Sequence, residues 1–577
     1  MSVGKAPSAS NLPDSTTGLT SQQPPDSDSQ PPGAQQPRLW GLLSRERIVA
    51  APDFNRWLVP PAALAVHLCI GMAYGFSVFW LPLGRALGGQ RPIVCAGATL
   101  GQALLSTRCD WKVSELGWMY TLFFVLLGVS AAIWGGWLER SGPRKAGVVS
   151  AACWCGGLLI SAAGVYLHQL WMLWLGSGVI GGVGLGLGYI SPVSTLIKWF
   201  PDRRGMATGM AIMGFGGGAM IGAPLCNKLM NLFATPQSVG VWQTFAVLAV
   251  LYGGFMLAGA FGYRVPPLGY RPAGFTPPAA GRALVSVHPV HLRDAHKTPQ
   301  FALLWAVLCL NVSAGIGVIG MASPMLQEIF AGALIGKPEI SFLELNPADK
   351  AAVAAIAAGF TGLLSLFNIG GRFFWASLSD KLGRKRTYDA FFVLGIVLYA
   401  SVPAAAHSGN KALFVAALGV ILSMYGGGFA TIPAYLADLF GTPFVGAIHG
   451  RLLTAWSTAG IFGPILVNYL REAQISAGVP RARVYDFTMY ILAGLLGLGF
   501  IVNRLIGPVA ARFHMRPEEV AALQAQSRPA AGAQQERTEA PQRSGLDGRV
   551  ALAWLAVGLP IAWGVWVTLS TALVLFR

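Results

Sequence analysis

The chain of 577 residues is too apolar and too poorly charged to be a soluble globular protein. Hydrophobic residues make up 54% of it and charged residues only 11%, and its mean hydropathy is +0.55. So few charges cannot cover the surface of a soluble protein of this length, so we expect a membrane protein. The formal net charge of +17 would suit a nucleic-acid partner, but the positions of the basic residues argue against one.

Apolar stretches long enough to cross a bilayer as helices recur from Trp57 almost to the last residue. A transmembrane helix needs about 20 mainly apolar residues. We expect twelve such helices and one extra C-terminal helix, at residues 57–83, 115–138, 146–166, 170–196, 206–227, 241–263, 302–329, 351–376, 387–405, 412–437, 449–469, 485–506 and 549–574. The expected fold class is therefore an all-α membrane protein.

The basic residues lie mostly in alternate loops, as in "RSGPRK" after the second stretch and "SDKLGRKR" after the eighth. This is the positive-inside bias, and it places the N-terminus and these loops in the cytoplasm. The bases then face lipid headgroups, so we expect a lipid bilayer and no nucleic acid as the partner. We predict a monomeric, multi-pass protein of a bacterial inner membrane.

Polar segments divide the chain. The first residues are rich in Pro, Ser and Gln, lack the apolar region of a signal peptide, and are too polar to form a core. The predicted division is a disordered cytoplasmic tail (1–55), an N-terminal six-helix bundle (56–264), a cytoplasmic linker (265–300), a C-terminal six-helix bundle (301–507), a second cytoplasmic tail (508–547) and the extra transmembrane helix (548–577). We expect that last helix to be a lipid-facing accessory.

The stretch "GSGVIGGVGLGLGY" at residues 176–189 has the glycine spacing of a dinucleotide-binding loop. Such a loop needs a preceding strand and a soluble helix after it, and both are missing from this apolar context. Gly178, Gly182 and Gly186 also recur at steps of four, which lets transmembrane helices approach closely. Helix packing is the favoured interpretation, and we expect no cofactor.

The seven cysteines form no metal-ligand pattern. Cys95 and Cys109 both fall in the first external loop, where they form either a disulfide or two free thiols. A second cluster, "HPVHLRDAH", is interpreted as a solvated linker rather than a metal site; it contains His288, His291, Asp294 and His296. We therefore expect no metal.

Two loops repeat each other at a shift of 241 residues. "GGWLERSGPRKAG" follows the second stretch and "ASLSDKLGRKRTY" follows the eighth, so each half carries six helices. An acidic residue, bases and a turn glycine suit a conformational latch at a helix end, with the carboxylate near a helix N-terminus and the bases near headgroups. The latch candidates are Glu139, Arg140, Gly142 and Arg144 in the first half, and Asp380, Lys381, Gly383 and Arg384 in the second.

This loop motif in a six-plus-six bundle resembles the major facilitator superfamily. Within it the chain resembles the oxalate/formate antiporter family, through "GMAYGFSVFWLPL", "GLGYISPVSTLIKWFPDRRGMATGMAIMGFGGGAMIGAP", "NIGGRFFWASLSDKLGR", "TIPAYLADLFG" and "GRLLTAWSTAGIFGP". The resemblance covers residues 55–507. It implies two halves that rock about a midplane site, alternately open to each side.

Arg372 lies inside an apolar stretch. Ionisable residues are rare and costly there, so each one suggests a functional role. The alternative is an arginine that snorkels to the headgroups. Its counterpart at the repeat shift is Ala131, and that of Asn368 is Leu127, so the symmetric fold does not require a charge there. A guanidinium matches a carboxylate in a bidentate manner. The resembled family also holds its dicarboxylate with an arginine in span eight.

The family's oxalate carrier pairs that arginine with a lysine in span eleven, whereas this chain has Trp456 at the matching place. One central positive charge points toward a monoanion, or toward a dianion neutralised in another way. Arg451 is the nearest other cation, and a headgroup anchor is its favoured interpretation. Aromatic side chains complete the predicted substrate site, with ordinary packing as the alternative: Tyr74, Tyr189, Tyr425 and Phe429, beside Trp456, Arg372 and Asn368.

His67 is the central titratable group and the coupling candidate, with a hydrogen-bonded packing histidine as the alternative. We therefore predict a secondary active transporter of small organic anions, mono- or dicarboxylates such as formate or oxalate, that works by alternating access and antiport. The alternatives are a proton-coupled monocarboxylate symporter and a transporter-like membrane sensor. A membrane enzyme would need clustered His, Asp or Glu at membrane depth, so we do not expect one.

Overall fold

The computed structural model describes residues 41–51, 53–88, 93, 95, 99–201, 204–236, 238–267, 270, 272, 289–441, 444–526 and 547–576. Residues 43–577 form one compact unit, to which the following description is confined. Its regular elements are helices. The predicted all-α class is confirmed.

Twelve helices in the described part of the chain are long and apolar enough to cross a membrane. A further helix, α17, runs beside them and is less apolar. Together they match the thirteen predicted stretches. They are η2–α2–η3–α3 (Arg56–Leu83), α5 (Val113–Ser141), α6 (Pro143–Tyr166), α7–η4–α8 (Leu170–Trp199), α9 (Arg204–Phe233), α10 (Val241–Gly262), α12 (Pro299–Phe330), α13 (Pro347–Leu382), α14 (Arg384–His407), α15 (Lys411–Phe440), α17 (Thr454–Ser476), α18 (Asp486–Leu505) and α20 (Gly548–Ala572).

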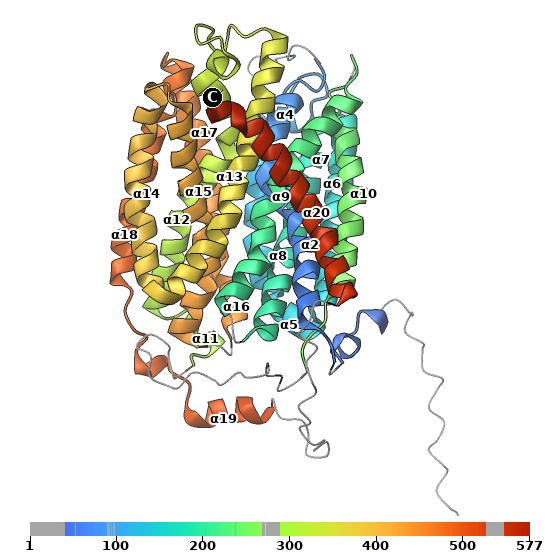
Figure 1. The fold of residues 1–577 in the computed structure, drawn as a ribbon, viewed down its shortest axis with the longest axis vertical. Helices are drawn as coiled ribbons and strands as arrows, with labels where there is room; N and C mark the ends of the chain where they lie inside the picture. Colours follow the sequence, from blue (N-terminus) through green and yellow to red (C-terminus); the bar gives the residue numbers. More distant parts are fainter. Residues whose placement is uncertain are drawn as a thin grey trace, which may run out of the picture. The chain divides into compact units, whose positions relative to one another are not determined.

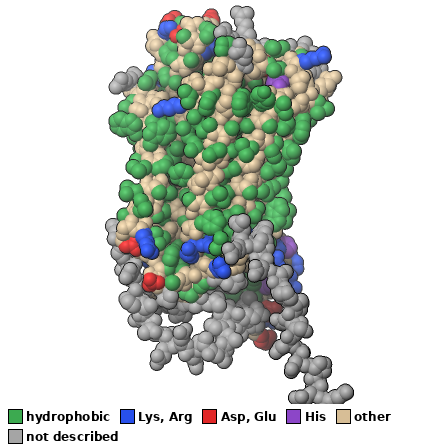
Figure 2. Space-filling model, turned by 90° about the vertical axis from the view of Figure 1, so that its right-hand side faces the viewer, with side chains coloured by type: hydrophobic (Ala, Val, Ile, Leu, Met, Phe, Trp, Pro, Cys, Tyr) green, Lys and Arg blue, Asp and Glu red, His purple; other side chains and the backbone are tan. Residues whose placement is uncertain are grey.

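The bundle has two ends with different landmarks. The latch end carries the turns at Gly142 and Gly383, together with the short helices α11 (Leu292–Ala295), α16 (Val445–Leu452) and α19 (Pro517–Gln526) (Figure 1). The disulfide end carries the bond between Cys95 and Cys109, so of the two alternatives left open by the sequence the structure has the disulfide. Figure 2 shows an apolar belt between the ends and charged side chains gathered at both, as a bilayer requires.

The two latch turns share one backbone conformation. Gly142 has φ +87° and Gly383 has φ +88°, which lies in a region that favours glycine and ends each helix sharply. Around Gly383, Arg384 bonds the Asp380 carboxylate, and its Nε lies 3.5 Å from Oδ2 of Asp438. The 241-residue repeat is therefore visible in the backbone.

The first-half latch differs in its side-chain contacts. Nη2 of Arg144 donates to the carbonyl oxygens of Phe261 and Tyr263, at 3.2 and 3.3 Å. Arg140 is exposed, and the side chain of Glu139 lies outside the described residues. The role of the eight residues as a latch stays a prediction.

The glycine-rich stretch packs helix against helix. A Cβ at Gly182 would lie 2.8 Å from Cβ of Leu126, and one at Gly186 would lie 2.0 Å from Oγ of Ser130. Both partners belong to α5, so α8 approaches α5 more closely than a larger side chain would permit. This agrees with the packing interpretation of the glycine spacing.

Helix α20 crosses the bundle diagonally and joins its two halves (Figure 1). On the first half, a Cβ at Gly564 would lie 2.8 Å from Cγ1 of Ile221 on α9. On the second half, Oγ1 of Thr568 would lie 2.5 Å from a Cβ at Gly362 on α13. On the opposite face Leu559 and Trp566 are exposed, and contact of that face with lipid stays a prediction.

We expect Gly564→Leu to lower the free energy of unfolding by about 1–3 kcal/mol, because the larger side chain would push α20 away from α9. Gly558→Leu is the matched control, since a Cβ there meets no atom within 4 Å. Thermal unfolding of the purified protein in detergent measures both. Equal stability of the two variants would show that α20 does not depend on this contact.

Candidate functional site

Arg372 lies in the middle of α13 and is completely buried, with 0% of its surface exposed. Its Nε donates to Oδ1 of Asn368 at 2.8 Å, and its Nη1 donates to the carbonyl oxygen of Ile212 at 2.9 Å. Asn368 is on the same helix, whereas Ile212 is on α9 of the other half. This burial rules out the alternative of a snorkelling arginine.

Glycines on both sides make room for this pair. A Cβ at Gly216 on α9 would lie 2.7 Å from Oδ1 of Asn368 and 3.0 Å from Nε of Arg372. A Cβ at Gly426 on α15 would lie 2.4 Å from the carbonyl oxygen of Asn368. A larger residue at Gly216 would displace the guanidinium, and one at Gly426 would push α15 away from α13.

Aromatic rings from both halves enclose the guanidinium, and we call them the aromatic cage. Cζ of Arg372 lies 5.9 Å from the ring centre of Phe215 and 5.7 Å from that of Phe429, within the range of a cation–π interaction. The ring of Trp456 packs at 4.2 Å from Phe429 and at 5.2 Å from Tyr189. The cage consists of Tyr74, Tyr189 and Phe215 from the first half, and Tyr425, Phe429 and Trp456 from the second.

Four hydrogen-bond donors in and around the cage are buried without a partner among the described residues. They are Nη2 of Arg372, Nδ2 of Asn368, Nε1 of Trp456 and the hydroxyl group of Tyr189. A buried donor without an acceptor is costly, and such groups are rare in native proteins. Donors around a fixed positive charge suit an anion with several acceptor oxygens.

His67 lies beside the cage on α2, and each of its ring nitrogens faces a carbonyl oxygen. Nδ1 contacts the carbonyl oxygen of Ala211, and Nε2 lies 3.2 Å from that of Tyr189. A neutral imidazole carries one N–H group, whereas the protonated ring carries two. The surroundings of His67 therefore supply acceptors for both forms.

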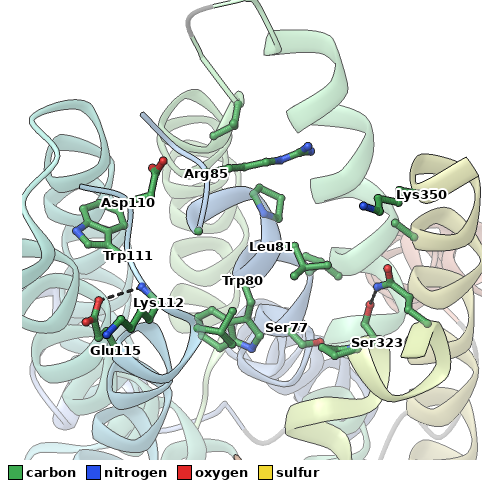
Figure 3. Close-up of a pocket in the computed structure, with 18 of the residues that line it drawn as sticks. Ser77, Trp80, Leu81, Arg85, Asp110, Trp111, Lys112, Glu115, Ser323 and Lys350 are labelled. Atoms are coloured by element: carbon green, nitrogen blue, oxygen red, sulfur yellow. Dashed lines mark hydrogen bonds between the residues drawn. The ribbon is translucent and has the colours of Figure 1, made fainter. Parts of the chain in front are cut away.

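A cavity of about 1660 Å³ opens at the disulfide end between the two halves (Figure 3). Its inner wall includes Ser77 on η3 and Ser323 on α12. Tyr74 precedes Ser77 by one helical turn on the same membrane helix and is fully buried. Its hydroxyl group lies 2.8 Å from that of Tyr425 in the other half. Neither member of this tyrosine pair lines the cavity, which we call the outer vestibule, and Arg372 does not line it either.

The latch end is closed. A Cβ at Gly450, on the latch-end helix α16, would lie only 3.1 Å from the carbonyl oxygen of Ala131 on α5 in the other half. A cavity of only about 30 Å³ lies between the halves near His449 and Ile190. The described conformation is therefore open toward the disulfide end and closed toward the latch end.

The structure brings together every residue that the sequence proposed for the substrate site, and His67 beside them. Two contributors were missed: the ring of Phe215 and the carbonyl oxygen of Ile212. Phe215 stands in "GFGGG", and an aromatic residue among glycines on a membrane helix is a signal that could have found it. Arg451 points away from the cage, since its Nη1 donates to the carbonyl oxygen of Leu292 at 3.0 Å.

Residues 66–464 match the family model of the Major Facilitator Superfamily. The chain belongs to this superfamily of transporters. It is 24% identical over 473 residues to the oxalate:formate antiporter of Oxalobacter formigenes, covering 81% of this chain and 96% of that protein. It is 22% identical over 424 residues to monocarboxylate transporter 11 of Homo sapiens, covering 72% and 77%.

Two further proteins are similar to this chain. The apicoplast pyruvate carrier 1 of Toxoplasma gondii is 26% identical over 418 residues, covering 64% of this chain and 70% of that protein. Among solved structures, a bacterial homologue of the human lysosomal transporter Spinster aligns with a TM-score of 0.51 at 16% identity, covering 80% of this chain and 98% of that one. The last similarity concerns the fold alone.

We expect Arg372→Lys to lower the affinity for a transported carboxylate by on the order of tenfold to a hundredfold, because an ammonium group cannot reproduce the planar fork. Arg451→Lys is the control, as this arginine lies outside the cage. Equilibrium binding and counterflow in proteoliposomes measure both. A selective loss in the Arg451 variant would place the anion elsewhere.

Proposed function

We propose that this protein exchanges small carboxylate anions across a membrane by alternating access, with monocarboxylates preferred over dicarboxylates. One observation carries the proposal: a single, fully buried guanidinium at the interface of the halves, surrounded by donors that have no partner among the described residues. A carboxylate would accept hydrogen bonds from this fork in a bidentate manner. The aromatic walls would exclude water and strengthen the charge interaction.

The preference for monocarboxylates follows from the charge count. Trp456 stands where the resembled oxalate carrier has a lysine, and it contributes a neutral donor in place of a second positive charge. A dicarboxylate would bring a second negative charge into a cage with one compensating cation, and an unpaired buried charge is strongly unfavourable. The names of the relatives, which include an oxalate:formate antiporter and a pyruvate carrier, are in keeping with small carboxylates.

The contact between Arg372 and Ile212 suggests how substrate drives the exchange. The Nη1 group of Arg372 donates to the carbonyl oxygen of Ile212 on α9 of the other half at 2.9 Å, and the latch end is closed. A carboxylate bound to the guanidinium would compete for its N–H groups and so weaken this link between the halves. A carrier without substrate would keep the link and change conformation slowly, and this difference favours antiport over a leak.

The orientation follows from charge. We propose that the latch end faces the cytoplasm of a bacterial inner membrane, because the basic loops lie there. The outer vestibule would then face outward. We also propose that one chain is the transporting unit, since both halves of the site come from a single chain.

Counterflow in proteoliposomes loaded with formate, acetate, lactate, oxalate or malonate tests the substrate class. We expect wild-type protein to exchange monocarboxylates, and Trp456→Lys to shift the relative affinity toward oxalate by about tenfold to a hundredfold, since it adds a second cation. Trp456→Phe is the control, because it keeps the aromatic ring and adds no charge. A wild-type preference for oxalate over every monocarboxylate would contradict the one-charge argument.

Proton-coupled symport is the second candidate, and the two carbonyl acceptors around His67 favour it. A carboxylate bound at Arg372 would bring a negative charge into the cage beside His67, so a proton taken up together with the carboxylate would balance that charge.

A pH gradient imposed on vesicles without internal substrate separates the two candidates. We expect no accumulation of labelled formate, because antiport needs substrate on both sides. Accumulation that is lost in His67→Gln, while that variant still performs counterflow, would establish symport instead.

A further inference from the structure

The outer vestibule carries an excess of positive charge. Six cationic and three acidic side chains line it among the described residues. The cations are Arg85, Arg108, Lys112, Lys350, Arg471 and Arg481, and the acids are Asp110, Glu115 and Glu472. Because its walls also include apolar side chains such as Trp80 and Leu81, the low-dielectric surface concentrates the field inside the cavity.

Two of the three acids are occupied by backbone donors. The Asp110 carboxylate accepts from the N–H groups of Leu87, Gly88 and Ile93, at 2.7, 3.0 and 2.8 Å. The Glu115 carboxylate accepts from the N–H group of Lys112 at 2.9 Å. Asp110 and Glu115 thus bind backbone N–H groups, so their oxygens are less available to the cationic side chains of the vestibule.

Two of the cations are also occupied. Arg471 and Arg481 both bind the carboxylate of Glu328, which is 3% exposed; Nη1 of Arg481 lies 3.1 Å from its Oε1. The hydroxyl group of Tyr485 donates to the same carboxylate at 2.7 Å. This buried cluster is structural, so the candidates for binding an anion lie elsewhere on the wall.

Four cations are left. Two of them, Arg85 and Lys350, point toward each other across the vestibule from opposite halves (Figure 3), whereas Arg108 and Lys112 both belong to the first half. Neither Arg85 nor Lys350 forms an ion pair within the described part of the chain. Lys350 stands in the first turn of α13, where the helix dipole adds to its positive charge. Its neighbour Asp349 is bound by Nζ of Lys337 at 2.8 Å.

We propose that Arg85 and Lys350 form an outer site where small carboxylate anions bind transiently before they pass the tyrosine pair to Arg372. The substrate class rests on the proposed function, whereas the positive potential of the vestibule does not. An anion between two like charges on opposite halves also offsets their repulsion.

A cysteine at Leu81 measures the potential without any transport. Leu81 lines the vestibule one helical turn from Arg85, is 42% exposed, and is visible in Figure 3. We expect Leu81→Cys to react faster with an anionic methanethiosulfonate than with a cationic one, relative to the rates with a free thiol. The unmodified protein supplies the background rate, since its free cysteines in the described residues are buried (Cys69, Cys226 and Cys309) or half-buried (Cys153 and Cys155).

Charge removal then tests the two residues. We expect Arg85→Gln and Lys350→Gln each to lower the anionic-to-cationic rate ratio about twofold to fivefold, most strongly at low ionic strength. Arg483→Gln is the matched control, because Arg483 is exposed near the same end and does not line the vestibule. An unchanged ratio in both test variants, or an equal fall in the control, would overturn the proposal.

Competition identifies the ligand. Millimolar formate should slow the anionic reagent in Leu81→Cys more than chloride at the same ionic strength, and the difference should vanish in the Arg85→Gln, Lys350→Gln double variant. Equal slowing by chloride would overturn a carboxylate site and leave only a general attraction of anions. This assay does not depend on transport, so it stays informative even if counterflow fails to detect carboxylate exchange.

Transport kinetics give the last readout. The double variant should raise KM several-fold and leave kcat nearly unchanged, because the outer site assists capture and not the rocking step. A fall in kcat at unchanged KM would assign these residues to the movement of the halves instead.

Discussion

The structure depends on a permanently charged guanidinium that is buried between two halves of a membrane protein. Removing such a charge from water costs several kcal/mol unless partners replace the lost hydration. Here the partners are the amide oxygen of Asn368, the carbonyl oxygen of Ile212 and the faces of Phe215 and Phe429. None of these partners is an acid, so the positive charge is solvated but not neutralised, and an anion can still supply that neutralisation.

This arrangement links the site to the interface of the halves. The same N–H groups that would bind a carboxylate hold α9 against α13, and the tyrosine pair joins the first membrane helix to α15 on the other side. These hydrogen bonds are weak enough to be replaced by bonds to a substrate, and directional enough to hold the two halves in one arrangement. Helix α20 adds a further bridge along α9 and α13, so any rocking of the halves must slide against it.

Much of the fold could be predicted from the sequence, because the bilayer dictates the length and hydropathy of the membrane helices and the charge of the loops between them. Arg372 stood out for the same reason, as a charge in an apolar stretch is rare. The contact with Ile212 could not be predicted, because it uses a backbone oxygen that every residue has. The position of α20 also escaped prediction, since its pattern shows that it can face lipid but not which helices its small residues touch.

The repeat explains why the site is asymmetric on a symmetric scaffold. Ala131, the counterpart of Arg372, lies on α5 against Gly450 of α16, where a Cβ would come within 3.1 Å of the Ala131 carbonyl oxygen. At the equivalent seam of the second half, Gly216 and Gly426 leave space that the arginine fills. Small residues therefore have two different roles at equivalent helix interfaces. At one interface they permit close contact between backbones, and at the other they leave room for a charged side chain. A scaffold with this freedom can acquire a charge in one half without changing how the other half packs.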